Sequence, residues 1–88
     1  MSRVVAMITK GGNPASNQDL VFHTDGTHFY SYGVKVASKK FGTSHVTLYE
    51  PYWNMYSQTT NYYLLQFLDE FSIKDIRKKV NSGDYLVA

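Results

Sequence analysis

The sequence predicts an α+β fold in which an antiparallel sheet of about four strands packs against two C-terminal helices. Two observations carry this prediction. Up to about residue 50, short runs of alternating apolar and polar side chains are separated by glycine-rich turns, a pattern typical of a β-meander. Beyond that point apolar residues recur every three to four positions, which is typical of amphipathic helices that cover a sheet.

The first half of the chain holds the four predicted strands, at about residues 3–9, 20–24, 27–39 and 45–49. Breaker residues separate the first two strands. Gly11-Gly12 and Asn13-Pro14 predict a loop that continues to about Gln18. Gly33 predicts a bulge or bend inside the third strand, which otherwise continues through its β-prone residues.

The clearest turn signal is Asp25-Gly26, which lies between two β-prone runs. Asp-Gly is typical of a two-residue hairpin turn, because both residues tolerate positive φ. This register pairs His23 with His28 and Phe22 with Phe29, so we expect the phenylalanine pair to lie in the core. Alternation then places Val21, both histidines and Tyr30 on the opposite side of the hairpin.

The second half of the chain predicts helices at about residues 58–71 and 73–82. Ser57 is the expected N-cap of the first helix. Ser72 is the expected N-cap of the second, where Asp75 three residues later resembles a capping box. The apolar face of the first helix consists of Tyr63, Leu64, Phe67, Leu68 and Phe71, and that of the second consists of Ile73, Ile76 and Val80. Gly83 predicts the helix end, and Tyr85-Leu86-Val87 a short closing strand.

Composition narrows the class of protein. The 88 residues predict a single domain over 1–88, and the absence of cysteine excludes disulfides and thiolate metal sites. No apolar run approaches about 18 residues, and the first residues do not resemble a secretory signal, so we expect a cytoplasmic protein without a membrane partner. The formal net charge of +2 is too small to indicate nucleic-acid binding by itself.

Catalytic and metal-binding signals are weak. The chain contains no nucleophile elbow, phosphate loop, dinucleotide fingerprint or zinc-protease motif, so we predict that it is not an enzyme and uses no cofactor. His23 and His28 form the best metal candidate, because the hairpin places them side by side. Zinc needs at least three protein ligands, and His45 would have to come from another strand, so we predict no metal site.

Aromatic residues are concentrated between Tyr49 and Phe71. The helix face explains only part of this excess; the remainder consists of Tyr52, Trp53, Tyr56 and Tyr62. Trp53 either plugs the sheet or anchors a partner, and the sequence leaves both alternatives open. Tyr and Trp dominate interface hot spots. We therefore predict a partner-binding surface of Tyr52, Tyr56 and Tyr62, with Lys39 and Lys40 at its rim.

A nucleic-acid interface is the alternative. Lys35, Lys39 and Lys40 can line one strand, and Arg77, Lys78 and Lys79 lie in the last turns of the second helix. Tyrosines exposed on a sheet can stack on unpaired bases. Asp69, Glu70 and Asp75 on the helices argue against this interface, because they reduce the local positive charge. The basic residues are equally well explained as ordinary charged side chains on solvent-exposed faces.

Several segments together resemble small uncharacterised bacteriophage proteins. The shared pattern runs through Phe29-Tyr30-Ser31-Tyr32, Val36-Ala37, Val46-Thr47-Leu48, Trp53, Tyr56-Ser57-Gln58-Thr59-Thr60, Tyr63 and Phe67-Leu68. This sequence departs from it by having two residues, Asn54 and Met55, between Trp53 and Tyr56 where the pattern has one. The resemblance implies a phage origin and the cytoplasm of a bacterial host, but it carries no known activity.

The predicted function is therefore that of a small non-enzymatic phage protein that binds and inhibits a host protein, such as a defence complex, stoichiometrically. The alternative is a nucleic-acid-binding regulatory protein. A homodimer, or an oligomeric virion or scaffold component, is a further expectation that a size measurement in solution tests.

Overall fold

The computed structural model describes residues 3–42, 45–49 and 58–88. Its elements are β1 (Arg3–Ile8), β2 (Pro14–Phe22), β3 (Gly26–Ser31), β4 (Val34–Lys40), β5 (Val46–Leu48), α1 (Gln58–Leu68), α2 (Ile73–Ser82) and β6 (Tyr85–Val87). The strands form one sheet in chain order, antiparallel throughout except for the parallel pair of β5 and β6. The α+β class is thus confirmed, with six strands in the sheet rather than about four.

Two strand boundaries differ from the prediction: the start of β2, and the division between β3 and β4. Of the residues expected to form the loop up to Gln18, those from Pro14 onward belong to β2, which pairs with β1 on one side and β3 on the other. The expected single strand over 27–39 is two strands, β3 and β4. Tyr32 and Gly33 both have positive φ, 53° and 78°, and therefore form a tight hairpin turn rather than a bulge.

The hairpin around Asp25-Gly26 forms, but its register differs from the prediction by two residues. Phe29 pairs with Leu20, and Phe22 pairs with Thr27, so the expected Phe22–Phe29 pair is wrong. Neither Asp25 nor Gly26 has positive φ, because β2 ends at Phe22 and the loop is longer than two residues. A slip of two residues preserves which side chains share a face, so the predicted division of the faces survives.

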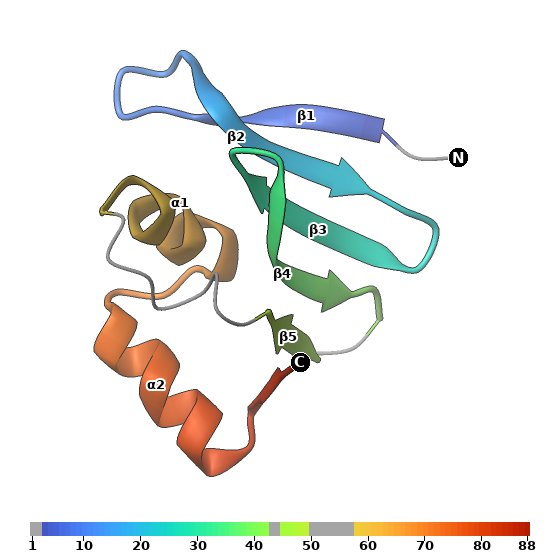
Figure 1. The fold of residues 1–88 in the computed structure, drawn as a ribbon, viewed down its shortest axis with the longest axis vertical. Coiled ribbons are helices and arrows are strands. Elements are labelled where there is room, and N and C mark those ends of the chain that lie inside the picture. Colours follow the sequence, from blue (N-terminus) through green and yellow to red (C-terminus); the bar gives the residue numbers. More distant parts are fainter. Residues whose placement is uncertain (1–2, 43–44, 50–57) are drawn as a thin grey trace.

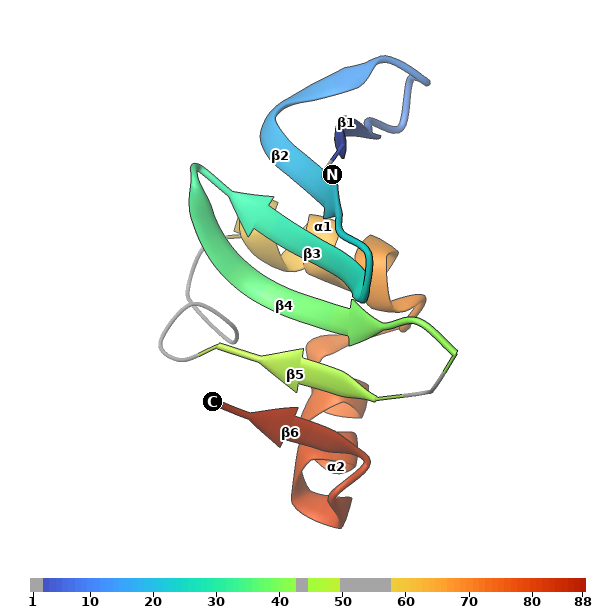
Figure 2. The ribbon, with the colours of Figure 1, turned by 90° about the vertical axis from the view of Figure 1, so that its right-hand side faces the viewer.

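Both helices cover the same face of the sheet. Figure 1 shows α1 and α2 on one side of the sheet, and Figure 2, turned so that the right-hand side of Figure 1 faces the viewer, shows β3 to β6 in front of the two helices. The strand register explains which residues face the helices. One row across all six strands, Val5-Leu20-Phe29-Ala37-Leu48-Val87, lies on the helix side, and the adjacent row, Val4-Val21-His28-Ser38-Thr47-Leu86, lies on the other.

The core lies between the sheet and the helices. Phe29 is completely buried, and its ring stacks on that of Phe67 from α1 with the centroids 5.7 Å apart. The Ser31 and Thr60 hydroxyls form a buried hydrogen bond of 2.8 Å between β3 and α1. Other core side chains come from β4, β5, α1, α2 and β6, and they include Ala37, Leu48, Leu64, Ile76 and Tyr85.

The first helix ends earlier than predicted, at Leu68. Asp69 adopts the left-handed conformation, with φ of 56°, which terminates the helical hydrogen-bond pattern. Phe71 therefore leaves the apolar face to which the sequence assigned it. Its side chain is 95% exposed, so its predicted place in the core is wrong, whereas Tyr63, Leu64, Phe67 and Leu68 are buried.

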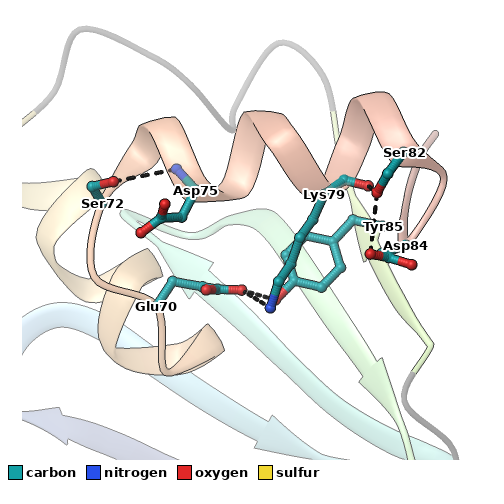
Figure 3. A network of polar contacts seen from close by, with 7 residues as sticks. All are labelled: Glu70, Ser72, Asp75, Lys79, Ser82, Asp84 and Tyr85. Carbon is teal, nitrogen blue, oxygen red and sulfur yellow. Dashed lines mark hydrogen bonds and ion pairs between the residues drawn. The ribbon is translucent and has the colours of Figure 1, made fainter.

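The second helix spans the predicted range and has the predicted caps. The Ser72 side chain accepts a hydrogen bond from the Asp75 backbone N–H, and Gly83 follows the helix in the left-handed conformation. Figure 3 shows the polar contacts that join this helix to its neighbours. Glu70 lies at their centre: Lys79 Nζ is 2.6 Å from Glu70 Oε2, and the Tyr85 hydroxyl donates to the same oxygen.

Electrostatics of this network follow from its geometry. Burial opposes the charged form of Glu70, but hydrogen bonds from Lys79 and Tyr85 outweigh it, so the pKa of this carboxyl falls below its usual value. Burial and the hydrogen bond to Glu70 raise the pKa of Tyr85 to about 12. The network therefore joins the end of α1 to α2 and β6 in its ionised state.

Replacing Glu70 by glutamine is expected to lower stability in a pH-dependent way. A carboxyl whose pKa is lowered by folding stabilises the protein above its unfolded pKa, near 4.3, and loses that contribution as pH falls through the folded value. At pH 7 we expect a loss of about 1–2 kcal/mol, chiefly from the hydrogen bond of buried Tyr85. The difference between wild type and Glu70→Gln in denaturant unfolding should shrink towards pH 3.

The control for this experiment is Asp84→Asn, which removes an exposed carboxylate that accepts from Ser82 at the end of α2. It matches the loss of one negative charge without touching Glu70. A stability difference between wild type and Glu70→Gln that stays constant from pH 7 to pH 3 would contradict this account of the network.

Candidate functional site

The face of the sheet opposite α1 and α2 is turned towards the viewer in Figure 2. Its central row ends in exposed aliphatic side chains, Val4 and Leu86, and has polar side chains, His28, Ser38 and Thr47, in the middle. The next row contains Asp19, Tyr30 and Lys35 from three neighbouring strands. We call this surface the open face. It carries aliphatic, polar, aromatic and charged side chains.

A hollow of about 460 Å³ lies on the open face, near the end of β4. Its lining includes Lys35, Lys40, His28 and His45, with Asp25 as the acidic member. Aromatic and aliphatic surface comes from Tyr49 and Leu86. The hollow therefore combines excess positive charge with hydrogen-bonding side chains, which suits an anionic group on a ligand or partner.

Contacts between neighbouring side chains position Tyr49 and Lys35. The Lys35 ammonium lies over the Tyr49 ring, 4.5 Å from its centroid, and the Tyr49 hydroxyl is 3.3 Å from Ser38 Oγ. The Tyr49 backbone N–H donates to Val36, which extends the pairing of β4 with β5 beyond Leu48. These contacts hold the lysine and the tyrosine in fixed positions on the open face.

The two histidines singled out from the sequence do lie together, although they are not register partners. The ring centroids of His23 and His28 are 4.4 Å apart, and His28 pairs with Val21 across the strands. Burial, with the positive charge of Lys35, lowers the pKa of His28, so its neutral form is favoured near pH 7. Among the described residues no three His, Cys, Asp or Glu side chains gather as metal ligands would.

The predicted partner-binding residues are only partly placed. Tyr52 and Tyr56 lie outside the described residues, as does Trp53. Tyr62 lies on α1 with 37% of its surface exposed, and its ring packs edge-on against Tyr63.

The two predicted rim lysines lie in different surroundings. Lys40 is exposed at the end of β4 and lines the hollow. Lys39 is half-buried on the helix side, with its ammonium 4.8 Å from the centroid of the Phe67 ring. Both Lys39 and Lys40 line the hollow on the open face, although neighbouring residues of a strand point to opposite faces.

Sequence reasoning found part of the open face but not the site as a whole. Strict alternation along the hairpin already placed Val21, His28 and Tyr30 on one side. Lys35, Thr47 and Tyr49 were missed as members of the same surface, because their positions depend on how β4 and β5 pair with β3. The only local signal for Tyr49 was its position directly after an apolar strand.

No helix in the described ranges is both long enough and apolar enough to span a bilayer.

Comparison with curated proteins gave no match, and neither did comparison with solved structures. A family-level match does exist. The family, described as "Family of unknown function (DUF8033)", matches residues 3–83. Since this match covers nearly the whole chain, the protein belongs to that family of unknown function.

Proposed function

We propose that this chain is a small non-enzymatic binding protein of bacteriophage origin, which inhibits a host protein such as a defence complex in the host cytoplasm. The single observation that supports this proposal is the open face, one side of a six-stranded sheet that no helix in the described ranges covers. The resemblance to small phage proteins supports the origin. The mixture of aromatic and basic groups on a shallow surface supports binding rather than catalysis.

The size of the open face agrees with a protein partner. The Cα atoms extend over 34 × 30 × 20 Å, and the view in Figure 2 spans the longest and the shortest of these dimensions. A specific protein interface of standard size takes about 800 Å² from each partner, so a protein partner would have to cover most of this side of the molecule.

The chemistry of the open face indicates what the partner presents. Tyr30 and Tyr49 offer rigid aromatic surface with a polar tip, the residue type enriched in interface hot spots. Lys35 and Lys40 add positive charge around the hollow. We therefore expect the partner to place a carboxylate-bearing segment in the hollow and apolar side chains against the tyrosines.

The test is capture from a bacterial lysate with the tagged full chain, with and without nuclease, followed by titration of the purified captured protein. We expect one-to-one binding that resists nuclease. The double variant Tyr30→Ala/Lys35→Glu should weaken it at least a hundredfold, since it removes an aromatic anchor and reverses a charge.

The matched control is Phe71→Ala/Lys74→Glu, which makes the same kind of changes on exposed residues of the helical region. It should leave affinity within threefold of wild type. The opposite result, loss of binding only in the helix variant, would transfer the site to the helical side of the molecule. A partner that binds both double variants as well as wild type would refute the open face as the site.

Single-stranded nucleic acid is the second candidate, and one observation favours it. The basic hollow lies on a helix-free sheet face that also carries Tyr30 and Tyr49, and sheet-surface aromatics can stack on unpaired bases while lysines bind phosphates. This candidate predicts binding of a labelled 12-nucleotide DNA or RNA that weakens steeply with salt. The protein-partner proposal predicts no such binding.

Light scattering on the same samples measures the molar mass in solution and so tests the expected homodimer.

A further inference from the structure

A second concave surface lies on the helix side of the sheet, away from the open face. It is a groove of about 560 Å³ between α1 and the strands β1 and β2. Apolar side chains form most of its lining: Val5, Met7, Ile8, Leu20, Phe22 and Phe67. Its volume lies within the roughly 300–1,000 Å³ typical of small-molecule sites, which are likewise mostly apolar with few polar groups.

The groove exists because the helix does not cover the whole sheet. The rings of Phe29 and Phe67 fill the centre of the helix-facing side, whereas Val5, Leu20 and Phe22 nearer to β1 are only half-buried. The Gln66 side chain donates a hydrogen bond of 3.1 Å to the Ile8 carbonyl, which ties α1 to β1 at the edge of this region. The apolar surface therefore remains hollow instead of collapsing onto the helix.

One cation belongs to this groove. Lys39 pairs with Thr27 across β3 and β4, both residues line the groove, and Phe22 is the next member of the same row. The ammonium lies over the Phe67 ring. Burial lowers the pKa of Lys39, and the negative charges of Asp69 and Glu70 oppose this shift only in part. No described carboxylate is in ion-pair contact with Lys39, since Glu70 pairs with Lys79.

We propose that this groove binds an aliphatic carboxylate, such as a free medium-chain fatty acid, with its head at Lys39 and its chain along Val5, Leu20 and Phe22. Charge complementarity selects this occupant. A half-buried ammonium without a carboxylate in contact gains from an anionic ligand, because the ligand replaces part of the hydration that burial removes. The apolar lining in turn favours a hydrocarbon chain over a polar one. This proposal is independent of the function proposed for the open face.

The test compares three ten-carbon ligands on the full wild-type chain: decanoate, decanol and decyltrimethylammonium. Amide chemical-shift titration at pH 7, below the micellar range, reports both affinity and location. We expect saturable one-to-one binding of decanoate, at least tenfold tighter than that of the other two. The shifts should gather around Val5, Leu20, Phe22 and Lys39. This comparison needs no variant and therefore does not depend on how a substitution affects folding.

Two variants then separate charge from packing. Lys39→Met keeps the aliphatic stem but removes the ammonium, and it should weaken decanoate at least tenfold while changing decanol less than threefold. Lys35→Met, on the open face, is the matched control and should leave both affinities unchanged. Equal affinity for decanoate and decanol, shifts centred on the open face, or no saturable binding at millimolar decanoate would each overturn the proposal.

Discussion

Replacing Phe29 by alanine is expected to destabilise the protein by about 3–5 kcal/mol. Phe29 is completely buried, and its ring stacks on Phe67 at the junction of the sheet and α1. The substitution removes the apolar contacts and leaves a cavity that the surrounding strands cannot fill. Because native domains are only about 5–15 kcal/mol stable, this loss removes a large part of the free energy of unfolding. Denaturant unfolding followed by far-UV circular dichroism measures the change.

The same substitution at Phe71 is the matched control. Phe71 lies at the turn between α1 and α2 with 95% of its side chain exposed, so Phe71→Ala should change the unfolding free energy by less than about 0.5 kcal/mol. The pair discriminates between the sequence pattern and the tertiary structure, because helical spacing assigns Phe71 to the apolar face. Comparable destabilisation by both substitutions would place Phe71 in the core and extend α1 beyond Leu68.

Replacing Gly26 by alanine is the second large effect, on the order of 3 kcal/mol. A Cβ at Gly26 would lie 2.1 Å from the Lys39 carbonyl oxygen, much closer than any real contact. Gly26 pairs with Lys40, and its carbonyl accepts from His23, so neither β4 nor the hairpin loop can yield without losing hydrogen bonds. We expect a clear fall in Tm with a native-like spectrum at low temperature.

Gly11→Ala is the control for this substitution. Gly11 has no positive φ, and an added Cβ would meet Asn13 Nδ2 at an ordinary 3.5 Å. The Tm of this variant should not fall, since the substitution only lowers the conformational entropy of the unfolded chain. If Gly26→Ala were equally mild, the strands β3 and β4 would have to lie farther apart than the structure places them.

Gly26 also shows how a correct local prediction can have a different physical cause. The Asp25-Gly26 pair was read as a turn because glycine tolerates positive φ, and a turn does form there. Its backbone, however, has ordinary φ values, and the glycine is required because the next strand passes too close for a side chain. Close approach of two strands depends on the tertiary fold, so no local pattern reveals it.

The residues of the candidate site likewise fall into two groups, those that local sequence patterns placed and those that only strand pairing placed. Alternation along the hairpin placed Val21, His28 and Tyr30 on one face, and the open face includes all three. Nothing local indicated that Lys35 would lie over Tyr49, because the two residues are brought together by the pairing of β4 with the strands on either side. The partner-binding surface of Tyr52, Tyr56 and Tyr62 was inferred from the excess of aromatic residues before and on α1. It remains a prediction.

The sequence by itself determined the fold class, the second helix with both of its caps, and the short closing strand. These features depend on signals within a few residues, such as the hydrogen bond of Ser72 to Asp75 and the left-handed glycine at Gly83. The tertiary structure decided the early start of β2, the split of β3 from β4, the hairpin register and the exposure of Phe71. Each of these features depends on residues that are far apart in the chain. Strand pairing and burial are stabilised by contacts between distant segments, and local sequence patterns do not show which segments will meet.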